Sequence, residues 1–183
     1  MNNYIDKNIN KILKFHQSSL NVVGYKDSII SYPPTINDYF LEKYKIDTFQ
    51  GIRAKLLNFL KNCLENLNPL ITMPIIVISG DVYSFDFLNN QLLKYKTTEL
   101  INDAEISISL FLELEKSLLI YKNSAYQEGL LQIGGISQTI TNFCKENNLN
   151  IIEKFIINQK FTHELGINLR KQLLIKNIFI KGF

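Results

Sequence analysis

The sequence predicts a soluble domain that mixes α-helices with β-strands. Residues 48–66 and 124–147 place apolar side chains at helical spacing, whereas several shorter segments alternate or run continuously apolar, which is typical of strands. The chain has 183 residues, of which 46% are hydrophobic, and this is enough for one core. Residues 1–183 are therefore expected to form one domain, with a less regular arm at about 18–47.

The expected helices differ in regularity. Residues 3–17 have an amphipathic pattern, with His16 on or beside the apolar stripe as a structural histidine. The arm that follows contains Pro33 and Pro34, which cannot continue a helix. In 48–66, Thr48 is the expected cap, and Cys63 is expected to pack against the core because no neighbour lowers its pKa.

Residues 124–147 form the longest expected helix. Ser124 is a candidate cap. Its expected apolar face is broad and comprises Leu130, Leu131, Ile133, Ile136, Ile140, Phe143 and Cys144. Gly134 and Gly135 lie in its middle, where each glycine costs about 1 kcal/mol relative to alanine. The pair indicates that another helix or a ligand approaches the backbone closely, and helix packing is the favoured interpretation.

The remaining elements are short. The expected strands are 75–78, 82–87, 91–96, 106–114, 151–157 and 173–180, with a turn at Ser79-Gly80-Asp81 and a hairpin turn at Asn89-Asn90. Residues 75–78 are continuously apolar, as in a strand buried on both faces. Short helices are expected around 97–103 and at 161–165, the second ending at Gly166. Glu113 and Glu115 are expected on a solvated edge.

Composition argues against several classes of function. The net charge is only +3, and Arg53 and Arg170 are the only arginines among 20 basic residues, so nucleic acid is not an expected partner. Two cysteines and two histidines, far apart in sequence, predict no metal site. The chain begins without a secretory h-region and has no apolar run long enough to span a membrane, so cytoplasm is the expected location.

Without reference to any protein family, the sequence shows no recognisable set of catalytic residues. The G-x-S-x-G, P-loop and dinucleotide-binding glycine patterns are all absent. The two histidines have no adjacent nucleophile in the sequence. This evidence alone supports a mixed α/β domain and no particular reaction.

One stretch resembles a known signature. Residues 120–138 read Ile-Tyr-Lys-Asn-Ser-Ala-Tyr-Gln-Glu-Gly-Leu-Leu-Gln-Ile-Gly-Gly-Ile-Ser-Gln. This resembles the SagB-type dehydrogenases, a branch of the FMN-dependent nitroreductase fold, through Ala125-Tyr126, Gly134 and Gln138. Shorter likenesses follow in the same order at 15–19, 82–92 and 161–166. The resemblance implies an α+β fold with a central, mainly antiparallel sheet and a long buried core helix at about 124–147, with flanking helices.

The resemblance also implies a chemistry. Family members oxidise azolines to azoles in ribosomally made peptides, with FMN at a homodimer interface taking a hydride from the ring. A Lys-Tyr pair is implicated in the proton transfer, and arginines near the first core helix hold the FMN phosphate. At the matching positions this chain has Ile120-Tyr121 in place of Lys-Tyr, and Lys43-Tyr44-Lys45 without an arginine pair.

Other family positions are altered as well. Ser124 replaces the motif arginine, Gly135 replaces a histidine, and Asn158-Gln159 replaces a Gly-Gly pair. The chain is therefore expected to be a degenerate member without cofactor. Such a subunit would act in assembly or peptide binding, as a homodimer or heterodimer with a nitroreductase-fold dehydrogenase, and with a cyclodehydratase and a precursor peptide as further partners.

Two alternatives stay open. The first is an active FMN-dependent oxidoreductase with altered contacts, in which Tyr121 or Tyr126 serves as acid or base. Its weak cofactor-binding candidates are Lys43, Lys45, Lys171, Lys176 and Gln138. For Tyr126 the competing interpretation is a ring at the core edge with a hydrogen-bonded hydroxyl. The second alternative discards the resemblance and treats the chain as a small binding module with apolar faces.

Overall fold

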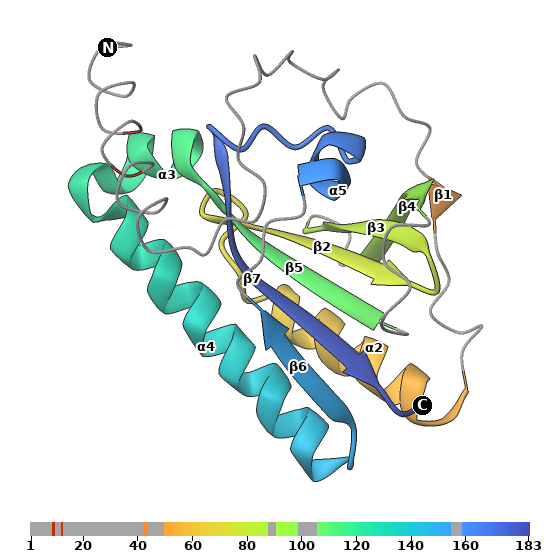
Figure 1. Ribbon diagram of the computed structural model, residues 1–183. Coiled ribbons are helices and arrows are strands. Elements are labelled where there is room, and N and C mark those ends of the chain that lie inside the picture. Colours follow the sequence, from red (N-terminus) through yellow and green to blue (C-terminus); the bar gives the residue numbers. More distant parts are fainter. Residues whose placement is uncertain are drawn as a thin grey trace.

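An antiparallel sheet organises a computed structural model, which describes residues 9, 12, 42–43, 50–87, 91–98, 106–154 and 159–183 (Figure 1). The seven strands are β1 (Glu42–Lys43), β2 (Thr72–Ile78), β3 (Asp81–Asp86), β4 (Gln91–Thr97), β5 (Ile106–Glu113), β6 (Asn150–Lys154) and β7 (Gln172–Lys181). Their order is β1-β4-β3-β2-β5-β7-β6, and each neighbouring pair is antiparallel. The predicted α+β class with a central antiparallel sheet is confirmed.

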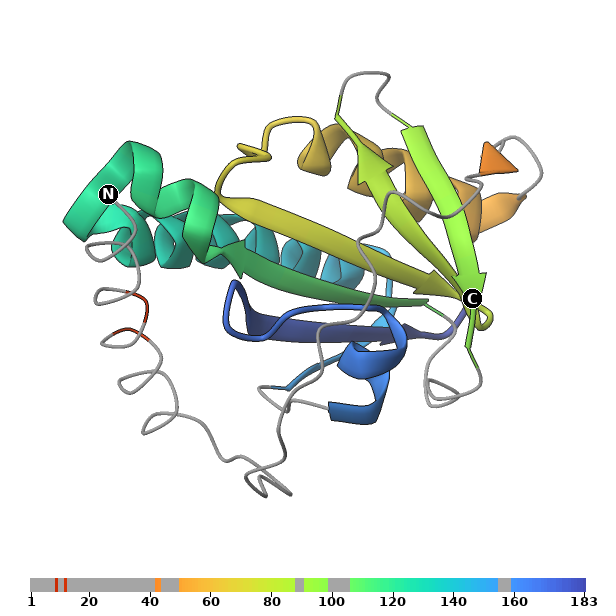
Figure 2. The ribbon, with the colours of Figure 1, turned by 90° about the horizontal axis from the view of Figure 1, so that it is seen from above.

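Helices cover the two faces of the sheet unequally. The helices are α2 (Gly51–Leu64), α3 (Leu114–Tyr121), α4 (Ala125–Glu146) and α5 (Gln159–Glu164), with a 3₁₀ turn (Lys122–Ser124) between α3 and α4. Figure 2 shows α2 and α4 on one side of the sheet and α5 on the other. The chain therefore has a larger core under α2 and α4 and a smaller core toward α5.

The alternation of side chains along β2 divides these two cores. Ile76 and Ile78 belong to the larger cluster, whereas Ile75 and Val77 belong to the smaller one. All four side chains are buried, so the expectation of a strand covered on both faces is confirmed. The turn after β2 is also confirmed. Ser79 and Gly80 have φ values of 50° and 87°, as a tight hairpin between paired strands requires.

The long helix α4 is buried on one face only. Its Gly129 lies against the side chain of Leu112 on β5, and Phe143 stacks on Phe59 of α2 with ring centroids 4.0 Å apart. Leu130 and Leu131 were expected on the buried face, but they are 38% and 70% exposed. The apolar stripe predicted from helical spacing was too broad, because a helix packed on a sheet buries only the side that faces it.

The glycine pair of α4 does not mark contact with another helix among the described residues. A Cβ atom added at Gly134 or Gly135 would have no atom within 4 Å, and both residues are exposed. The expectation that a packed helix explains them is therefore wrong for the described residues. The helix bears the propensity cost of two glycines, and no contact with the described part of the chain requires them.

Polar groups at the ends of elements also differ from expectation. Ser124 does not cap α4, because its hydroxyl donates to the carbonyl of Tyr121 at 2.9 Å. Glu113 is only 4% exposed rather than solvated, because β7 covers its side and Gln172 Nε2 donates to Glu113 Oε1 at 2.8 Å. Glu115 lies on α3, a helix that sequence analysis missed because its leucines continue the apolar pattern of β5.

Several expectations fall partly or wholly outside the described residues. These are the helix at 3–17 with His16, most of the arm at 18–47, the cap at Thr48, the turn at Asn89-Asn90 and the helix around 97–103. Within the arm, the structure describes β1 alone. The strand expected at 151–157 is described as β6, and the short helix before Gly166 as α5, with a φ of 69° at that glycine. The single-domain boundary stays a prediction.

Candidate functional site

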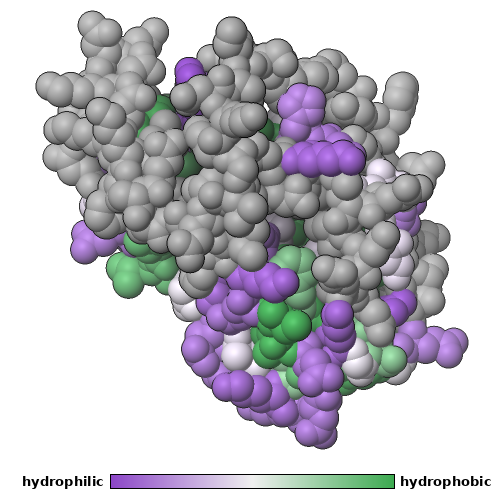
Figure 3. Space-filling view, in the orientation of Figure 1, coloured by the Kyte–Doolittle hydropathy of each residue, from purple (hydrophilic) through white to green (hydrophobic). Residues whose placement is uncertain are grey.

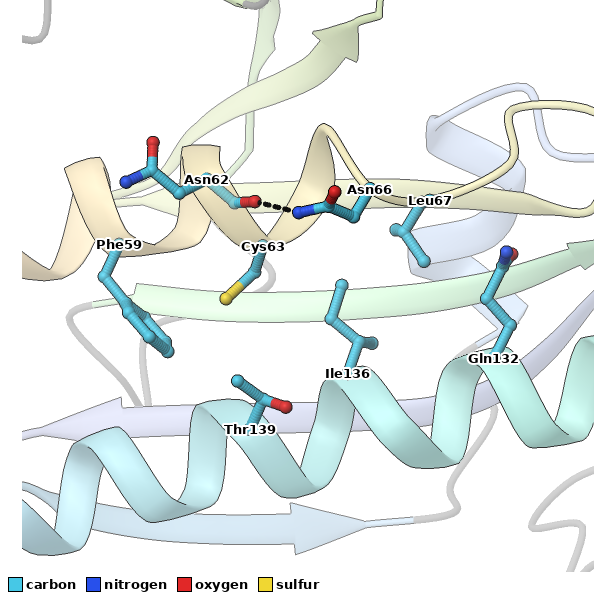
Figure 4. Close-up of a pocket in the computed structure, with 8 residues that line it drawn as sticks. All are labelled: Phe59, Asn62, Cys63, Asn66, Leu67, Gln132, Ile136 and Thr139. Atoms are coloured by element: carbon cyan, nitrogen blue, oxygen red, sulfur yellow. Dashed lines mark hydrogen bonds between the residues drawn. The ribbon is translucent and has the colours of Figure 1, made fainter.

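A hollow of about 330 Å³ lies between α2 and α4 (Figure 4). This volume is in the range of small-molecule sites. The residues that line it come from one side of each helix and from the chain just after α2: Phe59, Asn62, Cys63, Asn66, Leu67, Gln132, Ile136 and Thr139. None of these residues carries a formal charge, so the hollow suits an uncharged group.

Several polar groups at the hollow form hydrogen bonds within the chain. Thr72 on β2 is fully buried, and its hydroxyl donates to Gln132 Oε1 at 2.6 Å. Asn66 Nδ2 donates to the carbonyl of Asn62 at 2.8 Å, and the hydroxyl of Thr139 donates to the carbonyl of Gly135 at 3.0 Å. The lining is therefore a set of neutral amides and hydroxyls around an apolar floor.

The thiol in this hollow is not activated. Figure 4 shows the sulfur of Cys63 directed from α2 toward α4. Burial raises the pKa of Cys63 above its usual value, and burial also raises the pKa of Cys144 to about 11. A thiol needs a lowered pKa to act as a nucleophile at neutral pH. The geometry therefore supports binding at the hollow, and the expectation that Cys63 packs rather than reacts fits this environment.

Tyr121, a candidate acid or base, has a structural contact. It ends α3, and its hydroxyl accepts a hydrogen bond from Asn68 Nδ2 at 3.1 Å. The same Asn68 side chain accepts from the backbone N–H of Leu70 at 2.9 Å and so shapes the turn that leads into β2. Tyr121 is thereby linked to the turn between α2 and the sheet.

This contact predicts a specific loss of stability. Tyr121→Phe is expected to lower the free energy of unfolding by about 1 kcal/mol, because Asn68 loses a partner in a partly buried place. Urea denaturation measures the change. In a double-mutant cycle with Asn68→Ala, the two substitutions should be less than additive, since they remove the same bond. Full additivity would show that the two side chains are not coupled.

Tyr126, the second candidate, lies in the first turn of α4. Its ring packs against the larger core, and burial raises the pKa of its hydroxyl above 10. A phenol with a raised pKa stays protonated at neutral pH, so almost no phenolate is present to act as a base. The position agrees with the interpretation of a ring at the edge of the core.

The lysines considered for an FMN phosphate are paired with acids. Lys171 Nζ lies 2.6 Å from Glu115 Oε2, and Lys176 Nζ lies 2.6 Å from Glu153 Oε2. A phosphate placed on either ammonium would meet an adjacent carboxylate of like charge. At these two lysines the described residues do not fit the phosphate of FMN.

The other cofactor candidates do not join them. Gln138 is exposed on α4, where its Nε2 donates to Asn142 Oδ1 at 2.8 Å. Lys43 belongs to β1, at the edge of the sheet beside β4, and Lys45 lies outside the described residues. Their roles toward a cofactor stay predictions.

The described part of the chain contains neither a metal-binding cluster nor a helix that could span a membrane. No group of three or more His, Cys, Asp or Glu side chains there could hold a metal ion. Among the same residues, every helix is too short or too polar to cross a membrane.

The sequence pattern gave no sign that the residues lining the hollow form a site, although Cys63 and Ile136 were expected to be apolar packing residues. Asn62 on α2 and Asn66 just after that helix are four apart, and Gln132 and Ile136 are four apart on α4, so the members of each pair lie on the same side. The four-residue spacing is visible in the sequence. Asparagine is common in this chain, however, so Asn62 and Asn66 did not stand out as residues of a site. Only the packing of α2 beside α4 brings the two sides together.

Comparisons with known proteins agree on the fold. No protein-family model matches the sequence, and none of the curated proteins matches it either. Among solved structures, a protein assigned as a nitroreductase from Ralstonia eutropha JMP134 is similar with a TM-score of 0.59 and 9% identity, over 88% of each chain.

Two further structures are similar over most of this chain. The E. coli microcin synthetase McbBCD complex with truncated pro-MccB17 bound matches with a TM-score of 0.56 and 14% identity, over 94% of this chain and 80% of that one. A protein assigned as a nitroreductase from Anabaena variabilis ATCC 29413 matches with a TM-score of 0.56 and 11% identity, over 96% of this chain and 46% of that one. At such identities the likeness establishes the architecture alone, and the chain has a nitroreductase-like α+β fold.

Proposed function

We propose that this chain is a non-catalytic, nitroreductase-fold subunit of a complex that makes azole rings in ribosomally synthesised peptides. It acts there in assembly or in peptide binding, beside an active dehydrogenase or a cyclodehydratase. The observation that carries the proposal is the state of the candidate site residues. Lys171 and Lys176 are each paired with a carboxylate, and the hydroxyl of Tyr121 accepts from Asn68.

The sequence supports the same conclusion at the family positions. Ile120 stands where the resemblance implies a lysine that takes part in proton transfer, and loss of such a group typically costs about 10²–10⁴ in rate. The hollow between α2 and α4 contains no charged residue and no activated thiol, so it is suited to holding an uncharged group.

The similar solved structures support the proposed role in a peptide-modifying complex. One structure with this fold is the microcin synthetase complex with truncated pro-MccB17 bound. A chain that keeps the architecture while its candidate residues form structural contacts fits a subunit of such an assembly. The alternative of an active FMN oxidoreductase requires phosphate ligands other than Lys171 and Lys176.

The experiment is a flavin titration of the purified full chain, with an active nitroreductase as a positive control. We expect no saturable binding of FMN and no oxidised-flavin absorbance near ~450 nm in the protein as purified. No turnover of an azoline peptide or a quinone is expected with added FMN. A tagged chain expressed with its neighbouring genes should retain a second protein of the same complex. A stoichiometric yellow flavin with turnover would reject the non-catalytic assignment.

A further inference from the structure

Gln132 gives the hollow between α2 and α4 a hydrogen-bond donor whose direction is fixed. The hydroxyl of Thr72, which is fully buried, donates to Gln132 Oε1 at 2.6 Å. Because this bond engages the amide oxygen, the amide cannot turn over without depriving the buried Thr72 hydroxyl of its acceptor. Gln132 Nε2 therefore stays available as a donor at the wall of the hollow, and no described residue accepts from it.

Two other polar side chains of the hollow are fixed in the opposite sense, as acceptors. Asn66 Nδ2 donates to the carbonyl of Asn62 at 2.8 Å, which leaves Asn66 Oδ1 without a partner among the described residues. The Thr139 hydroxyl donates its one proton to the carbonyl of Gly135 at 3.0 Å, so its oxygen can only accept further bonds. In Figure 4, Gln132 lies toward one end of the hollow and Thr139 toward the other. A ligand that fills the hollow therefore meets one donor group and two acceptors.

The hollow is also neutral, unlike the surface near the end of α4. None of its lining residues carries a formal charge. Figure 3 shows hydrophilic side chains gathered at the lower end of the molecule, where α4 ends and β6 begins. The charged residues exposed on these two elements include Lys145, Glu146, Glu153 and Lys154. An ion placed in the hollow would lose water without gaining an opposite charge, whereas an uncharged polar group avoids this cost.

We propose that the hollow binds the side-chain carboxamide of a glutamine or asparagine in a peptide. A primary carboxamide is uncharged and flat, and it carries one acceptor oxygen and two N–H donors. Its oxygen accepts from Gln132 Nε2, and its nitrogen donates to Asn66 Oδ1 and Thr139 Oγ1. Its methylene groups lie against the apolar side chains of Leu67 and Ile136.

Other uncharged groups match this set of partners less well. A hydrocarbon side chain would displace water from the donor and from both acceptors and would replace none of their bonds, which costs free energy. A ring that offers acceptors alone would pair with Gln132 but would leave the oxygens of Asn66 and Thr139 without a donor. The inference rests on the proposed function, because it names the kind of residue that a peptide-binding subunit would hold.

The test is an NMR titration of the nitrogen-labelled full chain with three capped amino acids. The first probe, N-acetyl-glutamine methylamide, should shift the side-chain amide signals of Gln132 and Asn66 in a saturable way, with a Kd of about 1 mM. Capped glutamate has nearly the same shape but is charged, and capped methionine lacks the side-chain amide. Both keep the two backbone amides of the caps, and both should bind at least ~10-fold more weakly. Equal affinity for all three probes would overturn the proposal.

Substitutions in the hollow separate its donor from its acceptors. Gln132→Met keeps the length of the side chain but removes the donor, and it should weaken binding of capped glutamine by about 10-fold. Gln138→Met is the matched control, since Gln138 is exposed on α4 outside the hollow, and it should leave binding unchanged.

A second variant guards against a loss of folding. Gln132→Met also deprives the buried Thr72 hydroxyl of its acceptor, whereas Thr139→Val leaves that bond in place and removes an acceptor of the hollow. Thr139→Val should weaken binding of capped glutamine by ~5-fold or more. Unchanged affinity in either folded variant would contradict the proposed contacts.

The two proposals fail separately. A colourless chain that binds none of the three probes contradicts the carboxamide site and leaves the non-catalytic assignment standing. A chain that carries stoichiometric flavin with turnover, and still prefers capped glutamine, does the reverse.

Discussion

Replacing Gly129 with alanine is expected to lower the free energy of unfolding by about 1–3 kcal/mol, even though alanine favours helix more than glycine does. The added Cβ would collide with the side chain of Leu112, which is fully buried on β5. The tip of that leucine must move inside a filled core, and the helix must shift away from the sheet if it cannot. The gain in helix propensity, about 1 kcal/mol, is smaller than this loss.

The same substitution at Gly134 should have the opposite sign. Because no atom lies within 4 Å of a Cβ at that position, Gly134→Ala should raise stability by up to about 1 kcal/mol. Both changes are measured by urea denaturation of the purified full chain. If Gly129→Ala also stabilises the chain, then α4 does not pack on β5 as described.

Glu153→Gln is expected to destabilise the chain at neutral pH by roughly 1–2 kcal/mol, since the carboxylate joins three elements and is only partly exposed. Lys176 Nζ on β7 lies 2.6 Å from Glu153 Oε2. Ser137 and Thr141 of α4 donate to Glu153 Oε1 at 3.1 Å and 2.7 Å. Glutamine keeps the size of the side chain but removes the charge that holds these partners.

The loss should depend on pH in a defined direction. Burial by itself raises the pKa of Glu153, but the bonds from Lys176 and Thr141 outweigh it and leave the pKa below 4.5. A carboxyl group whose pKa is lowered by folding stabilises the folded state above its unfolded pKa. That contribution is lost as the pH falls through the folded pKa. The difference between wild type and Glu153→Gln should therefore shrink as the pH drops below 4.5.

A second ion pair provides the control for this experiment. Glu115 lies 2.6 Å from Lys171, but both side chains are nearly half exposed. Glu115→Gln should change stability by less than ~0.5 kcal/mol at any pH, because water screens an exposed pair. Equal losses for the two variants would mean that the three-element contact of Glu153 adds nothing to an ordinary surface pair.

Some features of the candidate site could be predicted from neighbouring residues in the sequence, whereas others depend on contacts between distant parts of the chain. Sequence analysis could place Tyr121, Tyr126 and Gln138 on or beside the long helix, because helical spacing is local. It could not find that Tyr121 meets Asn68, whose position depends on how the turn after α2 lies against α3. Nor could it find the acids beside Lys171 and Lys176, since both pairs join elements far apart along the chain.

The sequence by itself determined most of the described elements of this protein, with α3 as an exception, because strand alternation and helical spacing are properties of neighbouring residues. Strands β2, β5 and β7 and helices α2 and α4 all lie close to where the pattern predicted them. The tertiary structure alone decided what each side of an element meets. It buried Glu113 beside Gln172 of the neighbouring strand β7 and left Leu131 outside the core, because a helix or strand of fixed pattern buries only the side against which another part of the chain packs.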